Sequence, residues 1–437
     1  MKPSNVWAAR KELAARPLQA ILPSPWIRAL PFALVITDRW ADAIAVPFLA
    51  IVTVLRLLWL NNPAESIIFD EKFYVNAARV MLGWPLPTGA PYQGMPAGID
   101  PNLAHLPLAK AMIAGSMALF GDTPLGWRLP SVVMGVVAVA VIYLLVRHLT
   151  HRPWLALFAA FIFSFDNLVF VHSRIATLDI FMVSFLLLGV YAYARERPGM
   201  AGAAIALSGL AKFNGIFGLA AIIGFEVLRL ILRPDVRARW RRILADNLLF
   251  VGSFVFVFLA VLWGLDQSFT TFKSPLDHVG HVFDVGLSLR QDNPQGIASM
   301  PWQWLMNESV IPYYRVNVDS VADGAVVSSR SLVSFSGQMN LYVITMLPLA
   351  LAYLIHAALK KRDDLSLLML ALFAATFVQP FASAVLFHRI SYIFYFLPVL
   401  PALCVGIAYF LLDSRLPRVL PVIYAVSVLL GFIAIFP

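Results

Sequence analysis

The stretch WRLPSVVMGVVAVAVIYLLV, residues 127–146, decides the fold class. Arg128 is its only charged residue, and as a helix it is long enough to cross the hydrocarbon core of a bilayer, which takes about 20 apolar residues. Similar windows recur along the 437 residues, and the mean hydropathy is +0.79. A soluble protein is not this apolar, and a β-barrel would show alternating strands of about ten residues. The sequence therefore predicts an all-α polytopic membrane protein.

The apolar windows predict about eleven transmembrane helices. We expect a cytoplasmic N-terminal segment over 1–42 and a transmembrane domain over 43–437. The segment 1–42 lacks the compact apolar region and cleavage site of a signal peptide. The expected spans are 43–60, 127–146, 153–167, 175–194, 199–211, 214–232, 247–265, 339–359, 366–386, 391–412 and 418–436.

The basic residues predict the orientation of these spans. With the N-terminus inside, most of the 33 Lys and Arg residues fall in the N-terminal segment and in short inner loops, such as RPDVRARWRR (233–242) and KKRDD (360–364). The net charge of +9 is thus explained by membrane topology, and we expect no nucleic-acid partner. The single cysteine, Cys404, excludes an internal disulfide within the chain.

Two long segments, 61–126 and 267–338, then fall outside. The first contains EKFYVNAARVML (71–82) and HLPLAKAMIAGSMALFG (105–121), which predict amphipathic helices lying along the outer interface. The second contains SMPWQWLMNESVIPYY (299–314), whose Trp and Tyr residues suit a membrane boundary.

Two adjacent carboxylates, Asp70 and Glu71, begin the first of these helices in SIIFDEKFYVNAAR (66–79). An ordinary interpretation is a polar helix start. However, Asp70 follows an apolar run at the membrane edge, where burial would raise its pKa toward the range of a general base.

Several basic residues are expected at the same outer level as this pair. Each alone could be an interfacial anchor, but charges at a membrane boundary are costly and tend to mark function. A phosphate needs cations, and Arg binds it with two parallel hydrogen bonds. The combination predicts transfer of a group from a membrane-embedded phosphate to an acceptor outside. The basic residues are His105, Lys110, Arg128, Arg174, Lys212, His388 and Arg389.

An ordered set of motifs resembles the protein O-mannosyltransferase family of the GT-C superfamily, whose members use polyprenyl-phosphate sugars. The resemblance covers nearly the whole chain and implies eleven spans with the N-terminus inside, as the charges also indicate. An outer loop of about 70 residues is too short for the β-trefoil MIR domain of eukaryotic members, which indicates a prokaryotic type. The motifs are FDE, HLPLAK, FGDTPLGWRLPSVVMG, SRIATLD, GLAKFNG, PWQWL and FHRISYIFYFLPVLP.

The resemblance also implies roles for individual residues. Asp70 matches the catalytic aspartate, Glu71 matches a neighbour associated with acceptor binding, and Arg128 matches an arginine that holds the donor phosphate. His105 is expected at the acceptor, although HLPLAK departs from the family's His-Pro-Pro-Leu-Gly-Lys. From the residues themselves we add three cations for the donor phosphate: Arg174, Lys212 and Arg389.

The predicted activity is an inverting transfer of mannose, or a related sugar, from a polyprenyl-phosphate carrier to Ser or Thr hydroxyls of exported proteins, with Asp70 as general base. The expected location is the cell membrane, with the site on its extracytoplasmic face. No metal ligand set and no required cofactor are predicted, while a divalent cation at the carboxylate pair stays open. One alternative is a GT-C enzyme that moves aminoarabinose, arabinose or another sugar onto a glycolipid or wall glycan. A remote alternative is a secondary transporter, which would place its charges near mid-membrane on broken helices.

Overall fold

The computed structural model describes residues 38–62, 67–86, 100–322, 324–414 and 416–436. Residues 1–37, most of the predicted cytoplasmic segment, lie outside this part of the chain. The first half contains α2 (Asp38–Leu57), α3 (Glu71–Met81), α4 (Leu108–Phe120), α5 (Pro124–Thr150), α6 (Pro153–Ser164), α7 (Asn167–His172), α8 (Asp179–Ala194), α9 (Pro198–Ala211), the 3-10 helix η3 (Phe213–Ile216), α10 (Phe217–Leu232) and α11 (Pro234–Arg237). The second half contains α12 (Trp240–Phe269), α13 (Pro275–Ser288), α14 (Pro301–Leu305), β1 (Ile311–Ala322), β2 (Ala325–Gly337), α15 (Leu341–Ile344), α16 (Leu347–Lys360), α17 (Asp364–Phe387), the 3-10 helix η4 (Ile393–Val399), α18 (Leu400–Asp413) and α19 (Val419–Ala434).

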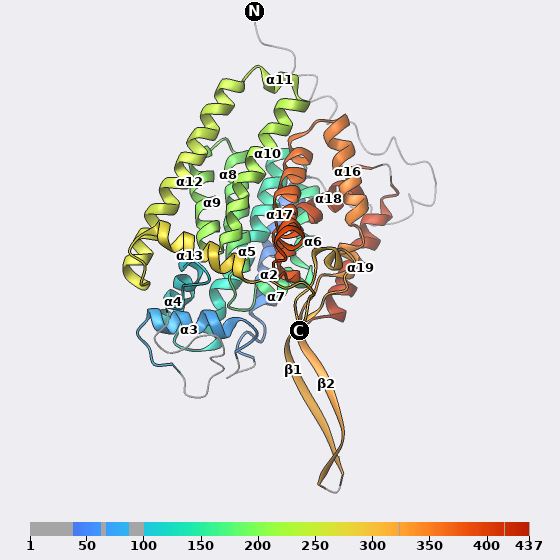
Figure 1. Cartoon of the computed structure of the whole chain (residues 1–437). Coiled ribbons are helices and arrows are strands. Elements are labelled where there is room, and N and C mark those ends of the chain that lie inside the picture. Colours follow the sequence, from blue (N-terminus) through green and yellow to red (C-terminus); the bar gives the residue numbers. More distant parts are fainter. Residues whose placement is uncertain (1–37, 63–66, 87–99, 323, 415, 437) are drawn as a thin grey trace, which may run out of the picture.

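Each of the eleven predicted spans overlaps a helix or two consecutive helices of the bundle (Figure 1). Within the described residues, seven such segments are long and apolar enough to cross a membrane. The remaining four, α6, α8, α9 and α19, are apolar but have only 12, 16, 14 and 16 residues. The polytopic helical membrane fold is confirmed, and the number of eleven crossings stays a prediction.

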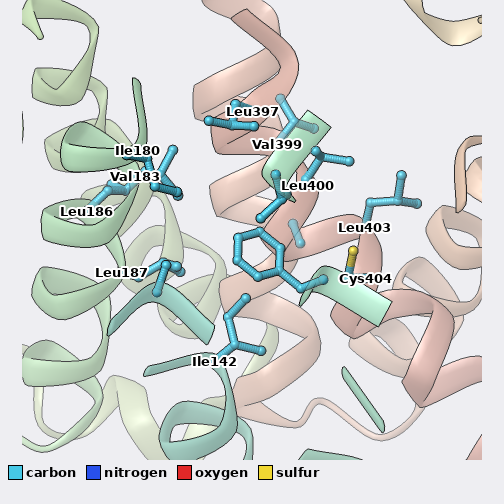
Figure 2. Close-up of a cluster of buried hydrophobic side chains, with 14 of the residues drawn as sticks. Ile142, Ile180, Val183, Leu186, Leu187, Leu397, Val399, Leu400, Leu403 and Cys404 are labelled. Carbon is cyan, nitrogen blue, oxygen red and sulfur yellow. The ribbon is translucent and has the colours of Figure 1, made fainter. Parts of the chain in front are cut away.

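The core of the bundle lies where α5, α8 and the η4–α18 segment meet (Figure 2). Ile142 of α5, Val183 and Leu187 of α8, and Leu400 and Cys404 of α18 are completely buried there. The helices approach closely enough that a Cβ at Gly135 of α5 would lie 2.4 Å from Ser173 Oγ, so only glycine fits. This close contact fixes the loop after α7 against α5.

The two ends of the bundle differ in character (Figure 1). The predicted interface helices form as α3 and α4 and lie at one end, whereas α11, in the basic loop 233–242, lies at the other. Residues 74–79 of α3 are all buried, so the middle of this helix is enclosed on all sides where it packs on the bundle. The segment with the carboxylate pair and the most basic loop are therefore on opposite sides.

The loop 267–338 contains a feature that the sequence interpretation did not include. Strands β1 and β2 form a two-stranded antiparallel hairpin that projects away from the helices (Figure 1). Alternating Val and polar residues suit strands, and Gly324 takes the positive φ of +76° that a tight turn requires. At the base of the hairpin, the ring of Tyr313 stacks on Phe69, with centroids 4.2 Å apart.

The first prediction concerns topology. In a Cys404→Ser background, Ser328→Cys on the exposed hairpin should react with a membrane-impermeant thiol reagent in intact cells, whereas Arg241→Cys beside α11 should not. Permeabilised cells provide the control, because both cysteines are on exposed residues and should then react. Reaction of Arg241→Cys in intact cells would contradict the predicted orientation.

Candidate active site

The backbone makes a sharp bend immediately before the carboxylate pair. Phe69 has a φ of +51°, a conformation that is rare and strained for a bulky residue. Its ring is held between Tyr313, on which it stacks, and Phe394, whose centroid is 6.0 Å away in an edge-on arrangement. The aromatic contacts therefore hold a bend that places Asp70 at the N-terminus of α3.

Glu71 is completely buried and accepts four hydrogen bonds. Its Oε1 accepts from Arg128 Nε at 2.8 Å and from the backbone N–H of Ala176 at 2.9 Å. Its Oε2 accepts from Arg128 Nη2 at 2.9 Å and from the backbone N–H of Ile68 at 2.8 Å. Glu71 thus joins the bend before α3, the N-terminal part of α5 and the loop before α8.

Arg128 is equally buried and its guanidinium also reaches the end of the first span. Its Nη1 donates to the carbonyl oxygens of Leu60 and Asn62, at 2.9 and 3.0 Å. These contacts commit Arg128 to the protein interior beside Glu71. The predicted roles of Arg128 at the donor phosphate and of Glu71 at the acceptor stay predictions, and the geometry gives both residues a structural task.

Asp70 faces the other way, into a cavity of about 320 Å³. Four of the predicted site residues line this cavity together: Asp70, His105, Lys212 and Arg389. Lys110 lines it as well, whereas Glu71, Arg128 and Arg174 do not. The other lining residues are mostly aromatic: Phe69, Phe73, Tyr74, Tyr392, Phe394 and Tyr395, with Pro101, Ala104, Leu289 and Ile297.

The surroundings of Asp70 suit a proton acceptor. Burial raises the pKa of its carboxyl group to about 6, with the negative charge of Asp179 acting in the same direction and Lys212 and Lys72 opposing it. A base with a pKa near the working pH is effective, because it is ionised and still binds a proton.

Lys212 supplies a positive charge to the cavity from the end of α9. Its Nζ donates to Asp179 Oδ1 at 2.6 Å and lies over the rings of Phe394 and Tyr395, 4.8 and 5.1 Å from their centroids. An ammonium group has three N–H donors, so this one hydrogen bond does not exhaust its capacity.

A network behind Lys212 was not predicted from the sequence. His172 lies between Asp179, with Nδ1 3.8 Å from Oδ2, and Tyr313, with Nε2 2.8 Å from the hydroxyl. Burial lowers the pKa of His172 to about 4, so its imidazole is neutral near pH 7. Asp179 belongs to the motif SRIATLD, which was the available signal, while Tyr313 reaches the site only because the hairpin begins there.

Lys110 and His105 belong to the part of the cavity wall that α4 and the loop before it provide. Lys110 Nζ donates to the carbonyl oxygens of His105 and Pro101, at 2.6 and 3.1 Å, and so holds the loop before α4. Burial lowers the pKa of Lys110 to about 7. Burial and the nearby cations Lys212, Lys110 and Arg389 also hold the pKa of His105 well below its usual value.

Arg389 reaches the cavity from the segment after α17. Its Nη1 donates to the carbonyl oxygen of Gly286 in α13, which connects the second outer segment to the site. Within the described residues, no group of three or more His, Cys, Asp or Glu side chains is arranged to hold a metal ion. The charged groups of this cavity are therefore one carboxylate at Asp70 and nearby Lys and Arg side chains.

Comparisons with known proteins agree with this architecture. The S. cerevisiae protein O-mannosyltransferase Pmt1–Pmt2 complex bound to the sugar donor superposes with a TM-score of 0.68 at 12% identity, covering 95% of this chain and 91% of that chain. ArnT from Cupriavidus metallidurans bound to undecaprenyl phosphate gives 0.56 at 20% identity, covering 86% and 61%. At these identities the likeness concerns the fold, and the chain has the GT-C fold.

The sequence comparisons are more specific. Residues 104–263 match the family model described as dolichyl-phosphate-mannose-protein mannosyltransferase. A polyprenol-phosphate-mannose–protein mannosyltransferase of Corynebacterium glutamicum is 31% identical over 169 residues, which are 37% of this chain. The match spans only about a third of that relative, 31% of its length. The resemblance to protein O-mannosyltransferases is thus confirmed over the middle of the chain, which contains His105, Arg128, Arg174 and Lys212.

The second prediction tests the structural task of Arg128. Arg128→Ala leaves Glu71 as an unpaired buried carboxylate, so we expect a loss of about 3–5 kcal/mol in the free energy of unfolding. Arg128→Lys should recover only part of this loss, since Lys lacks the planar fork. The measurement is the unfolding of the purified protein in detergent.

Arg147→Ala is the matched control for this prediction. Arg147 also belongs to α5, but its ion pair with Asp42 is partly exposed, at 34% and 45% of the two side chains. Loss of such a pair should change the free energy of unfolding by at most about 1 kcal/mol. Wild-type stability of Arg128→Ala, combined with weakened donor binding, would instead support the phosphate role predicted from the sequence.

Proposed function

We propose that the protein is an inverting glycosyltransferase that takes a mannosyl residue from a polyprenyl-phosphate carrier and attaches it to a Ser or Thr hydroxyl of an exported protein. The observation that carries this proposal is the single cavity in which Asp70 faces Lys212 and Arg389. The matching family model and the names of the relatives support the donor and the acceptor class.

Asp70 would act as the general base of the transfer. The acceptor hydroxyl gives its proton to the Asp70 carboxylate while its oxygen forms a bond to the anomeric carbon. The bond between that carbon and the phosphate oxygen breaks on the opposite side, so the configuration inverts. The bonding electrons leave with the polyprenyl phosphate, and the proton stays on Asp70 until solvent accepts it.

The leaving phosphate would be bound by Lys212 and Arg389. The charge on the phosphate grows as the bond to the sugar breaks, so cations placed there stabilise the transition state more than the ground state. The aromatic walls of the cavity, including Tyr74 and Tyr395, would pack against the faces of the sugar and the start of the polyprenyl chain. A volume of about 320 Å³ is at the lower end of the usual range for small-molecule sites.

The remaining parts of the proposal concern placement. The membrane would be the cell membrane, with the cavity on its extracytoplasmic face, because the basic loop at α11 lies at the other end of the bundle. We also propose that residues 43–437 act as one catalytic domain, to which the segments 61–126 and 267–338 contribute Asp70 and the hairpin.

The direct test is incubation of the purified protein with labelled polyprenyl-phosphate-mannose and a Ser/Thr-containing acceptor peptide. Mannosylated peptide is the expected product. Transfer of label to a glycolipid, with none to the peptide, would favour the alternative acceptor. Failure to use any polyprenyl-phosphate sugar would contradict the proposal.

The third prediction concerns Asp70. Asp70→Asn keeps the shape of the side chain and removes its basicity, so the rate at saturating substrates should fall about 10²–10⁴-fold, while donor binding is nearly unchanged. In the wild type, the rate should rise with pH through an apparent pKa near 6, since the base must be ionised. A fully active Asp70→Asn variant would exclude Asp70 as the base.

Asp70→Asn should lower the rate but raise the stability of the folded protein at neutral pH. The pKa of Asp70 is higher in the folded protein than its usual value of 3.8, so the native state loses stability as pH rises from about 4 to about 6. At pH 7.5 Asp70→Asn should therefore unfold at a higher temperature than the wild type, and near pH 4 this difference should vanish. A lower unfolding temperature at pH 7.5 would mean that the loss of activity reflects misfolding.

The fourth prediction separates Arg389 from its neighbour. Arg389→Gln removes a charge from the cavity and should weaken donor binding by about 10–100-fold, the contribution of a hydrogen bond to a charged group. The control is Arg290→Gln, because Arg290 pairs with Arg389 through its backbone but is exposed and does not line the cavity. Equal donor affinities in the two variants would remove Arg389 from the phosphate site.

A further inference from the structure

Two buried arginines lie outside the cavity, at the end of the bundle where α2 finishes. Arg56 is in the last turn of α2 and Arg174 is in the loop after α7, and they are 1% and 6% exposed. Both guanidinium groups contact the ring of Phe170, at 5.1 and 5.3 Å from its centroid. Neither residue lines the cavity that contains Asp70.

The hydrogen bonds of these two arginines go to neutral groups and are incomplete. Arg56 donates to Ser164 Oγ at 3.2 Å and to the carbonyl oxygens of Ser164 and Val52, both at 3.3 Å, while its Nε has no partner. Arg174 donates through Nη2 to the carbonyl oxygen of Leu58, while its Nε and Nη1 have none.

No carboxylate compensates either charge within the described part of the chain. The nearby Arg128 forms an ion pair with Glu71. Among the described residues, Arg56 and Arg174 form no ion pair with a carboxylate. Arginine stays protonated in proteins, so these two groups cannot escape the cost of burial by losing a proton. An anion that accepts from the unused N–H donors would offset the cost of burying these two cations.

The surroundings indicate which anion can reach this place. Leu58 and Trp59 lie in the turn that follows α2 and are 37% and 61% exposed. The helix α2 before them is itself apolar and mostly exposed. The ring of Trp59 lies 6.3 Å from Phe436, which in turn lies 5.5 Å from Phe170. The rings of Phe170 and Phe436 thus connect the two arginines to the exposed Trp59, and a Trp at the end of an apolar span is typical of a membrane boundary.

We propose that Arg56 and Arg174 form a second anion site, which binds the phosphate group of a membrane lipid and is separate from the cavity that contains Asp70. The planar guanidinium groups would hold the phosphate oxygens through the N–H groups that have no protein partner. The lipid chains would lie against the apolar surface of α2 and beside Trp59 and Phe436. This inference does not depend on the proposed glycosyltransferase activity.

The test measures thermal unfolding of delipidated protein in a phosphate-free maltoside detergent, titrated with phosphatidylglycerol. A ligand that binds only the folded state raises the unfolding temperature with its concentration. We expect a rise with phosphatidylglycerol and none with diacylglycerol, which has the same chains without the phosphate. Inorganic phosphate distinguishes the source of the anion, and an equal rise with phosphate alone would overturn the assignment to a lipid.

Variants locate the effect. The double variant Arg56→Gln/Arg174→Gln should abolish the rise in unfolding temperature with phosphatidylglycerol. Arg174→Lys should leave a smaller rise, since Lys keeps the charge but lacks the planar guanidinium group. The Lys212→Gln/Arg389→Gln protein should keep the full rise, which separates this site from the cavity. Arg147→Gln, in the last turn of α5, is the charge-matched control and should also keep the full rise in unfolding temperature.

Two results would overturn the proposal. One is an undiminished phosphatidylglycerol effect in the Arg56/Arg174 double variant. The other is a wild type that does not respond, together with a gain in stability on Arg174→Gln in the absence of lipid, as expected for a buried charge that never has a partner. Native mass spectrometry gives an independent reading, because wild-type protein should retain about one phospholipid that the double variant lacks.

Discussion

The architecture of the site depends on the buried ion pair between Glu71 and Arg128. Four N–H donors converge on one carboxylate, and they come from the bend before α3, from α5 and from the loop before α8. The same guanidinium extends the contact to the carbonyls at the end of the first span. Removing one partner of such a pair costs far more than the pair contributes, because the other charge remains buried. The segments it joins are therefore constrained as a set, and Asp70 is positioned by that constraint.

Adjacent carboxylates can take different tasks because successive residues of a helix point about 100° apart. Glu71 turns inward, where its charge is fully compensated and its hydrogen bonds are used. Asp70 turns toward the cavity, where burial raises its pKa to about 6 and leaves it able to exchange a proton. The inward carboxylate fixes the backbone, and the strained Phe69 conformation beside it directs the outward one. The pair is thus an arrangement in which one acid holds the other in place.

The helical architecture could be predicted from the sequence because each apolar window carries its own signal, whereas the hairpin was missed. The helices α3 and α4 form where amphipathic spacing predicts them, and every predicted span overlaps a helix. The hairpin also had a local signal, since Asp323 and Gly324 form a dipeptide typical of tight turns between runs rich in Val and Ser. The apolar windows that predict spans carry no information about a polar outer segment, so they do not distinguish a hairpin from a loop. What no local pattern contains is the packing of Tyr313 on Phe69, which joins the hairpin base to the site.

In the candidate site, too, the sequence predicts which charged residues collect, and only the contacts in the structure show what each of them does. The sequence predicted that cations collect at the outer boundary, and Lys212 and Arg389 do meet Asp70 in one cavity although far apart in the chain. It could not separate these from Arg128 and Arg174, because charge and approximate depth are alike in all four and only contacts distinguish them. In the structure Arg128 uses its N–H groups on Glu71 and on backbone carbonyls, Lys212 pairs with Asp179 but keeps further donors, and Arg174 has N–H groups without a partner. A buried cation with unused N–H donors pays a desolvation cost that an anion from outside the protein would offset. Under the proposed function this boundary lies in a membrane, and the anions that meet these cations are phosphates carried by lipids, either a donor that is cleaved or a headgroup that is bound.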